Sequence, residues 1–274
     1  MRGLYSCIIA VSMYSKIPMP GVEWTKERMA YVMCWFPVVG LLEGAVLGLW
    51  FWLGVNVFRF TRLFTALAGA ALPLLVTGGI HMDGFLDTMD ALHSYGDRAK
   101  KLDILKDPHI GAFAVISLAV YMLLYTGIFY EYTSLLAVNQ PFRGVFYLLP
   151  GVIFTMERSL SGLSVVAFPP AKKDGLAAGF AGAAKKQAEK PALLAWAAIC
   201  AAASGLAGKY GLICGLAVLS LQLLVFAWYY RMSQREFGGV TGDLAGCFLQ
   251  ICEAVSFGGI VLLIHIVFRG GVMG

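Results

Sequence analysis

The stretch Thr77–Gly111, TGGIHMDGFLDTMDALHSYGDRAKKLDILKDPHIG, is densely polar in a chain that is otherwise strongly apolar. It places Asp83, Asp87 and Asp90 within eight residues. On a helix of about 100° per residue, these positions fall within an arc of roughly 60°, so the carboxylates share one face. Two carboxylates ~4 Å apart repel by about 4 kcal/mol at an effective dielectric of about 20. Because a cation relieves this repulsion and Mg²⁺ prefers oxygen ligands, we predict that Asp83, Asp87 and Asp90 bind Mg²⁺.

The alternative interpretation of these aspartates is a solvated helix face, as in a soluble protein. The composition argues against it, because 59% of the 274 residues are hydrophobic and only 14% are charged. In soluble domains about a quarter of the residues are charged. No linker or shift in composition divides the chain. We predict an all-α fold, a polytopic integral membrane helical bundle that forms one catalytic domain over residues 1–274.

Seven apolar runs are long enough, or nearly so, to cross a hydrocarbon core about 30 Å thick. The second and fifth runs are short, so a re-entrant segment and counts from six to eight stay open. Within the first run, Gly40, Gly44 and Gly48 recur at every fourth position, a spacing that lets helix backbones approach closely. We expect about seven transmembrane helices, at residues 31–56, 63–79, 111–130, 145–166, 192–207, 212–230 and 244–268.

The distribution of Lys and Arg predicts the orientation. With the N-terminus in the cytoplasm, fifteen of the 21 basic residues lie inside and five outside, and Arg158 lies within a span. This bias follows the positive-inside rule. The polar segments 77–110, 168–190 and 231–243 then share the inner face. We expect a multi-pass protein of the cytoplasmic membrane of a prokaryote, with its active site facing the cytoplasm.

Basic residues follow the aspartate cluster. Lys106 can pair with Asp103 at spacing i, i+3 on a surface helix that ends before Pro108. Alternatively, Arg98 and Lys106 face phosphate groups, and both interpretations stay open. For His109 alone, the residues favour a structural role.

Arg158 lies next to Glu157, deep in an apolar run. A charge at that depth costs at least ~2.5–3.5 kcal/mol unless it is paired or faces a polar cavity. The sequence leaves two roles open for Arg158, a phosphate contact and a structural ion pair. Glu43 and Glu253 raise the same question, and for Glu43 we favour the structural answer.

The segment Phe237–Asp243, FGGVTGD, opens the last apolar run. Its glycines permit a close backbone approach, and Thr241 or Asp243 can cap the helix that follows. A helix start beside a carboxylate can hold a phosphate and a metal ion together. We therefore predict that this segment joins the aspartate cluster at one site.

These motifs together resemble the cobalamin synthase family, the adenosylcobinamide-GDP ribazoletransferases. The likeness runs nearly end to end, and its most specific parts are the aspartate core and the G-G-x-T-G-D motif. It departs from the family at Lys16, where many members have Arg, at Glu157 and at Pro169–Lys173. The residues that carry the likeness are Ser15–Pro20 (SKIPMP), Phe36–Gly40 (FPVVG), Thr77–Asp90, Leu102–Asp107 with Gly111, Arg158, Gly175 with Leu176, and Gly238–Asp243.

The resemblance implies transfer of adenosylcobinamide phosphate from adenosylcobinamide-GDP to α-ribazole or its 5′-phosphate, with release of GMP and a requirement for Mg²⁺. The alternatives are a membrane transporter and an enzyme like the CDP-alcohol phosphotransferases. Besides these substrates we expect a lipid bilayer as surrounding and no nucleic-acid partner, and a homo-oligomer stays open. The predicted site residues are Asp90, Asp243, Lys106 and Arg158 for catalysis, His81, Arg98, Gly239, Thr241 and Gly242 for substrate binding, and Asp83, Asp87 and Asp90 for Mg²⁺.

Overall fold

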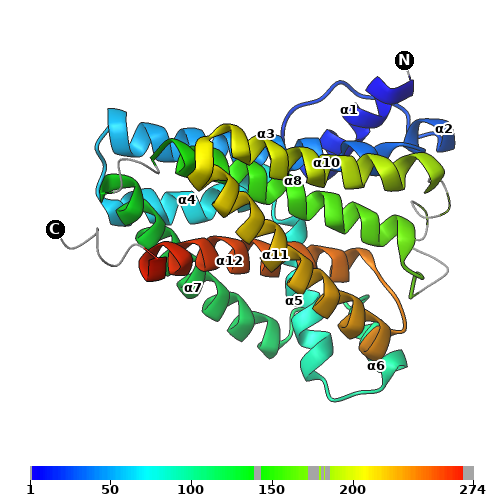
Figure 1. Ribbon diagram of the computed structural model, residues 1–274. Coiled ribbons are helices and arrows are strands. Elements are labelled where there is room, and N and C mark those ends of the chain that lie inside the picture. Colours follow the sequence, from blue (N-terminus) through cyan, green and yellow to red (C-terminus); the bar gives the residue numbers. More distant parts are fainter. Residues whose placement is uncertain (1, 139–142, 172–178, 180–181, 183–185, 268–274) are drawn as a thin grey trace.

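A computed structural model describes residues 2–138, 143–171, 179, 182 and 186–267. Apart from one parallel β-bridge between Pro170 and Val240, the regular structure of these residues is helical, as predicted (Figure 1). The elements are α1 (Arg2–Tyr14), α2 (Lys26–Met29), α3 (Val32–Trp52), η1 (Leu53–Val57), α4 (Arg62–Thr77), α5 (Ile80–His93), α6 (Arg98–Ile104), α7 (Ala112–Val138), α8 (Arg143–Ala167), α10 (Lys186–Leu206), α11 (Gly208–Met232), η3 (Ser233–Phe237) and α12 (Gly242–Val267).

Helix α8 lies at the centre of the bundle, packed against α3, α10, α11 and α12. The predicted glycine stripe makes its contact with α3 possible. A Cβ atom at Gly40, Gly44 or Gly48 would overlap the backbone of α8, at Phe154, Gly151 and Tyr147 respectively. The two backbones therefore touch along three turns, as small-residue spacing allows.

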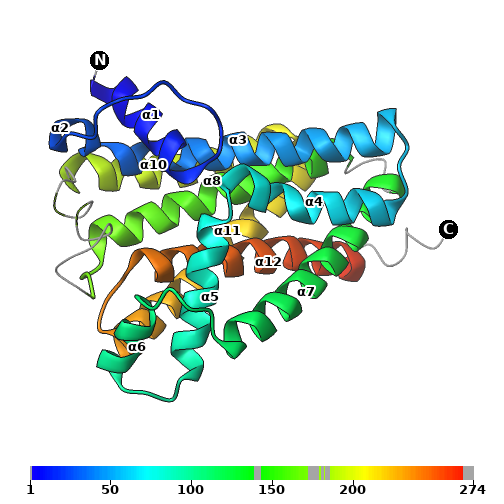
Figure 2. The ribbon, with the colours of Figure 1, turned by 180° about the vertical axis from the view of Figure 1, so that it is seen from behind.

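A sharp elbow separates α4 from α5, whose axes differ by 95°. Gly78 and Gly79 both adopt the left-handed conformation, with φ of 66° and 77°. Only glycine adopts such values routinely, so the Thr77-Gly78-Gly79 motif ends one helix and starts the next in a new direction. Figure 2 shows the result: α5 leaves the line of α4 and runs towards α6.

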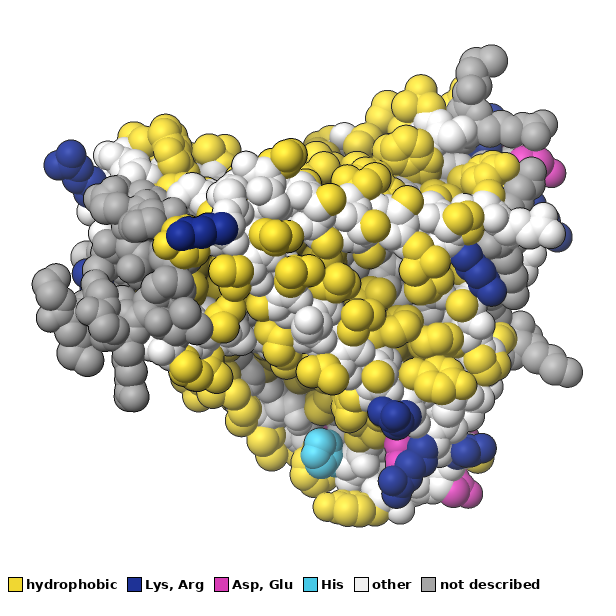
Figure 3. Space-filling model, viewed as in Figure 1, with side chains coloured by type: hydrophobic (Ala, Val, Ile, Leu, Met, Phe, Trp, Pro, Cys, Tyr) yellow, Lys and Arg dark blue, Asp and Glu magenta, His cyan; other side chains and the backbone are white. Residues whose placement is uncertain are grey.

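Four helices of the described part of the chain are long and apolar enough to cross a membrane: α3 with η1, α7, α11 with η3, and α12. The bent pair α4 and α5 is a fifth candidate. The face in Figure 3 is largely hydrophobic across its middle, and Lys and Arg gather at its lower edge over α6. The protein is therefore an all-α membrane helical bundle.

The predicted count of seven membrane helices is not confirmed. Segments 145–166 and 192–207 do form helices, α8 and α10, but neither belongs to the group that is apolar enough to span. The reason for α8 is its position: neighbouring helices bury most of it, including Glu157 and Arg158. Charged side chains within a membrane bundle are tolerated where they face its interior and pair with one another.

Candidate active site

Helices α5 and α12 bring the acidic residues together. A Cβ atom at Gly84 would lie 2.7 Å from the carbonyl oxygen of Asp243, and one at Gly246 would lie 3.0 Å from the carbonyl oxygen of His81. The helices can cross this closely only because both positions are glycine. The half-buried carboxylate of Asp87 therefore lies close enough to Asp243 to be repelled by it, in addition to Asp83 and Asp90 of its own helix.

A cavity of about 290 Å³ lies beside this crossing. Asp83 and Asp243 line it together with Gly242 and the ring of His81. His81 is only 4% exposed, and no described residue bonds its Nε2 atom. The cavity thus has two acidic residues in a mainly apolar wall, with the unbonded ring nitrogen of His81 buried in that wall, an arrangement suited to a ligand with a few polar groups.

Aromatic side chains also line this cavity. The rings of Tyr14 and Phe36 each lie 6.0 Å from the ring of His81, measured between centroids, and 4.4 Å from one another. Neither Tyr14 nor Phe36 was among the site residues predicted from the sequence. The signal for Phe36 was its place in the FPVVG motif, whereas nothing in the local sequence marks Tyr14.

Asp90 shares the face of Asp83 and Asp87 but contacts another element. Its Oδ2 atom accepts a hydrogen bond from the N–H of Gly111 at 2.6 Å, and its Oδ1 atom accepts one from Ala114 at 2.8 Å. These N–H groups belong to the start of α7, where the helix itself offers no acceptor for them. Asp90 therefore caps α7, and its roles as metal ligand and as base stay predictions.

Among the described residues, no group of three His, Cys, Asp or Glu side chains stands ready to hold a metal ion. The carboxylates of Asp83, Asp87 and Asp243 nevertheless have the oxygen donors that Mg²⁺ prefers. Their mutual repulsion at Asp87 is also the interaction that a cation relieves. These residues match the predicted ion in the chemistry of their oxygen donors, and the Mg²⁺ site itself stays a prediction.

The predicted basic residues lie outside the cavity. Arg98 donates from Nε to the carbonyl of Arg235 and from Nη2 to that of Gln234, both at 3.1 Å, so it ties α6 to η3. Lys106 is exposed and lies 3.8 Å from Asp103, the surface pair that the spacing allowed. Neither Arg98 nor Lys106 lines the cavity, and their phosphate contacts stay predictions.

His109 forms the structural contact that the sequence favoured. Its backbone N–H donates to the Asp107 carboxylate at 2.9 Å, and its ring nitrogen lies 2.7 Å from the same oxygen. The hydrogen bonds from the backbone and side chain of His109 lower the pKa of Asp107 below its usual value. This pair fixes the turn that leads into α7.

The residues of the segment before α12 have different structural roles. The hydroxyl of Thr241 accepts from the N–H of Leu244 at 3.2 Å and caps the helix, one of the two predicted caps. Gly239 packs against the backbone of Pro169–Ala171, which pairs with Val240. Gly242 has open space where a Cβ would lie, and it lines the cavity. The loop residues Gly175 and Leu176 lie outside the described residues.

Arg158 is fully buried in a set of ion pairs. Its Nη2 atom lies 2.5 Å from Glu43, its Nη1 atom lies 2.7 Å from Glu157, and Nη1 also donates to the carbonyl of Phe154. Glu253 lies nearby and accepts from the hydroxyl of Tyr125 at 3.3 Å. Because this guanidinium joins α3 to α8 without reaching the cavity lining, its geometry supports the structural ion pair.

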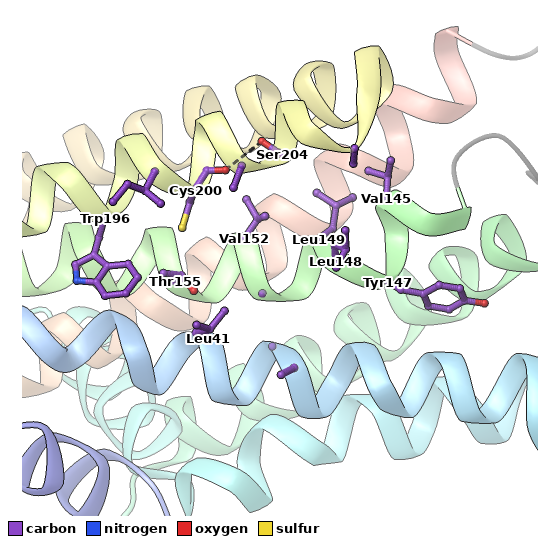
Figure 4. Close-up of a pocket in the computed structure, with 16 residues that line it drawn as sticks. Leu41, Val145, Tyr147, Leu148, Leu149, Val152, Thr155, Trp196, Cys200 and Ser204 are labelled. Carbon is purple, nitrogen blue, oxygen red and sulfur yellow. Dashed lines mark hydrogen bonds between the residues drawn. The ribbon is translucent and has the colours of Figure 1, made fainter.

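A second, apolar cavity of about 360 Å³ lies between α3, α8 and α10 (Figure 4). Its walls include Leu41, Val152 and Trp196, and no described Asp, Glu, Lys or Arg lines it. Phosphate chemistry needs charged or metal-binding groups. The cavity beside α5 and α12 is therefore the candidate active site.

The fold and site define a class: a multi-pass membrane protein whose carboxylates meet at a cavity beside a bent helix pair. The family model for cobalamin-5-phosphate synthase matches residues 6–261. The chain belongs to that family. No solved structure matches it.

Three curated relatives carry the same name, adenosylcobinamide-GDP ribazoletransferase. The one from Lachnoclostridium phytofermentans is 38% identical over 270 residues, 98% of this chain and 98% of the relative. That from Desulfitobacterium hafniense is 31% identical over 97% of this chain and 98% of the relative. The relative from Clostridium botulinum strain Alaska E43 is 30% identical over 93% of this chain and 97% of the relative. These transferase names do not favour the transporter alternative.

The Arg158 ion pairs lead to a prediction about stability. Replacing Arg158 by Met leaves Glu43 and Glu157 buried without their partner, which costs roughly 3–5 kcal/mol. We expect a lower melting temperature in detergent, partly recovered when Glu43→Gln is added. Arg231→Met, at an exposed arginine, serves as the control. Should Arg158→Met melt like the unaltered protein yet lose turnover, Arg158 acts on the substrate instead.

Proposed function

We propose that this protein transfers adenosylcobinamide phosphate from adenosylcobinamide-GDP to a ribose hydroxyl of α-ribazole or of its 5′-phosphate, and releases GMP. The names of relatives that align over nearly the whole chain support this reaction. The observation that carries it in the structure is the meeting of Asp83 and Asp87 from α5 with Asp243 from α12.

The reaction forms one phosphorus–oxygen bond and breaks another. The ribose hydroxyl attacks the phosphorus that carries the cobinamide, the bond to the bridging oxygen breaks, and GMP leaves with that oxygen. The hydroxyl proton passes to a carboxylate, for which Asp243 is our candidate because both Asp90 oxygens already accept backbone hydrogen bonds.

Asp83 and Asp87 are the residues that we propose would hold Mg²⁺, and Asp243 lies beside them. When bound, the ion would neutralise diphosphate oxygens and the charge that develops on the leaving phosphate. The apolar walls around His81 would exclude water, which strengthens each electrostatic contact in the site. The free Nε2 atom of His81 would orient a substrate polar group.

We also propose that the site faces the cytoplasm across the cytoplasmic membrane. The excess of Lys and Arg on one side of the predicted topology supports this orientation. Water-soluble nucleotides would then reach the site, and GMP would leave it, without crossing the bilayer.

The reaction is tested by incubating purified protein with both substrates and Mg²⁺ and measuring GMP. We expect a metal chelator to abolish the release. Loss of a metal ligand, in Asp83→Asn or Asp87→Asn, should raise the Mg²⁺ needed for half activity. Loss of a base, in Asp243→Asn, should lower turnover by about 10²–10⁴-fold with little change in that requirement.

Asp103→Asn is the matched control, because the Asp103 carboxylate is 77% exposed and lies outside the cavity lining. Near-full turnover and an unaltered Mg²⁺ response in both Asp83→Asn and Asp87→Asn would place the metal elsewhere. Absence of GMP release from the unaltered protein would contradict the proposed reaction itself.

The orientation is tested by labelling introduced cysteines in intact cells, in a background without Cys7 and Cys34. The test positions are Tyr95, which is 91% exposed, and Arg235, whose side chain is 86% exposed. Phe58, between η1 and α4, serves as the control for the opposite side. We expect a membrane-impermeant reagent added outside to modify the Phe58→Cys variant only. Modification of both Tyr95→Cys and Arg235→Cys from outside would reverse the proposed orientation.

A further inference from the structure

An outer cavity of about 420 Å³ adjoins the candidate active site. It shares Met13, Ile80 and Asp83 with the inner cavity of the site. Unlike the inner cavity, it is lined mainly by polar residues and glycines: Ser12, Ser15, Lys16 and the Thr77-Gly78-Gly79 elbow. Asp83 thus lines both the polar outer cavity and the aromatic inner cavity.

Lys16 is held in place by the elbow. Its backbone N–H donates to the carbonyl of Val76 at 2.7 Å, at the end of α4. Ser15, which is buried, accepts from the N–H of Ile17 at 3.3 Å and donates to the carbonyl of Val11 at 2.6 Å. These bonds fix the turn after α1, so that the backbone of Lys16 has one position.

The side chain of Lys16 lies across Gly78. A Cβ atom at Gly78 would overlap Cε of Lys16 and would lie 3.0 Å from its Cδ and Cγ. Gly78 therefore serves two purposes, since it adopts a left-handed φ and leaves room for this aliphatic chain. The aliphatic chain of Lys16 thus lies over the elbow, and Lys16, which is exposed, lines the outer cavity.

The ammonium of Lys16 has no acidic partner among the described residues, because none of their carboxylates lies within ion-pair distance of it. An unpaired cation at the wall of a polar cavity attracts an anion. A second unbonded group is the buried Nε2 atom of His81, a residue that lines the adjoining cavity together with Asp83. Both point to a ligand that occupies the two cavities together.

We infer that Lys16 binds the diphosphate of the nucleotide-activated donor in the outer cavity. This inference rests on the proposed function, from which the donor's diphosphate follows. Lys16 takes no part in bond making. It holds the diphosphate beside Asp83, one of the carboxylates that would hold Mg²⁺. The aromatic inner cavity is then left for the ring of the acceptor.

The test measures binding of GDP with Mg²⁺ to the full-length protein by calorimetry, together with the KM for each substrate. Lys16→Met should weaken GDP binding and raise the donor KM by about tenfold or more, because a charge-assisted hydrogen bond is lost. The acceptor KM should not change. Lys16→Arg should restore binding, and Lys26→Met, at an exposed lysine outside both cavities, should bind as the unaltered protein does.

Unchanged GDP binding in a folded Lys16→Met protein would overturn the inference. Lys16→Gln, which keeps a polar chain without the charge, replaces Lys16→Met if the latter melts early, and the same result is expected of it. If the unaltered protein binds GDP through Lys16 yet releases no GMP, the proposed reaction fails while the phosphate site stands. If it releases GMP and neither neutral variant alters GDP binding, only the site at Lys16 fails.

Discussion

The backbone-to-backbone crossing of α5 and α12 is the constraint on which the site depends. A side chain at Gly84 would meet the backbone of Asp243, and one at Gly246 would meet that of His81, so either would push the helices apart. Because the crossing is this close, the carboxylate of Asp243, near the end of the chain, lies beside those of Asp83 and Asp87. The resulting repulsion among like charges costs stability, and proteins retain such clusters where a ligand offsets the cost.

The elbow before α5 gives the crossing its direction. With a continuous helix, α5 would extend the line of α4 and would not meet the start of α12. The two left-handed glycines turn the chain by 95° and also leave room for Lys16. At the other end of α5, Asp90 caps α7 and fixes where that helix begins. One helix thus carries the face that we propose binds metal, a structural cap for α7 and the approach to the proposed phosphate site.

Much of this arrangement could be predicted from local sequence. Apolar runs indicated the helices, the spacing of Gly40, Gly44 and Gly48 indicated a close helix contact, and the period of Asp83 and Asp87 indicated a shared face.

Contacts between distant residues could not be predicted in the same way. One partner of Arg158 is Glu43, which lies 115 positions earlier. No local sequence pattern around either residue predicts that the two side chains pair. Asp90 follows the same period as Asp83, yet its oxygens bind the backbone of another helix, which only the fold decides. The count of membrane helices was likewise out of reach, because the burial of α8 depends on its neighbours.

The central claim is that carboxylates from α5 and α12 act as one catalytic unit. The most direct test is a double-mutant cycle, with GMP release measured for Asp87→Asn, Asp243→Asn and the two combined. Residues that act as a unit are strongly non-additive. The structure predicts that the combined variant loses about as much turnover as the less active of the two single variants. Losses that multiply would show that Asp87 and Asp243 act independently and would contradict the account.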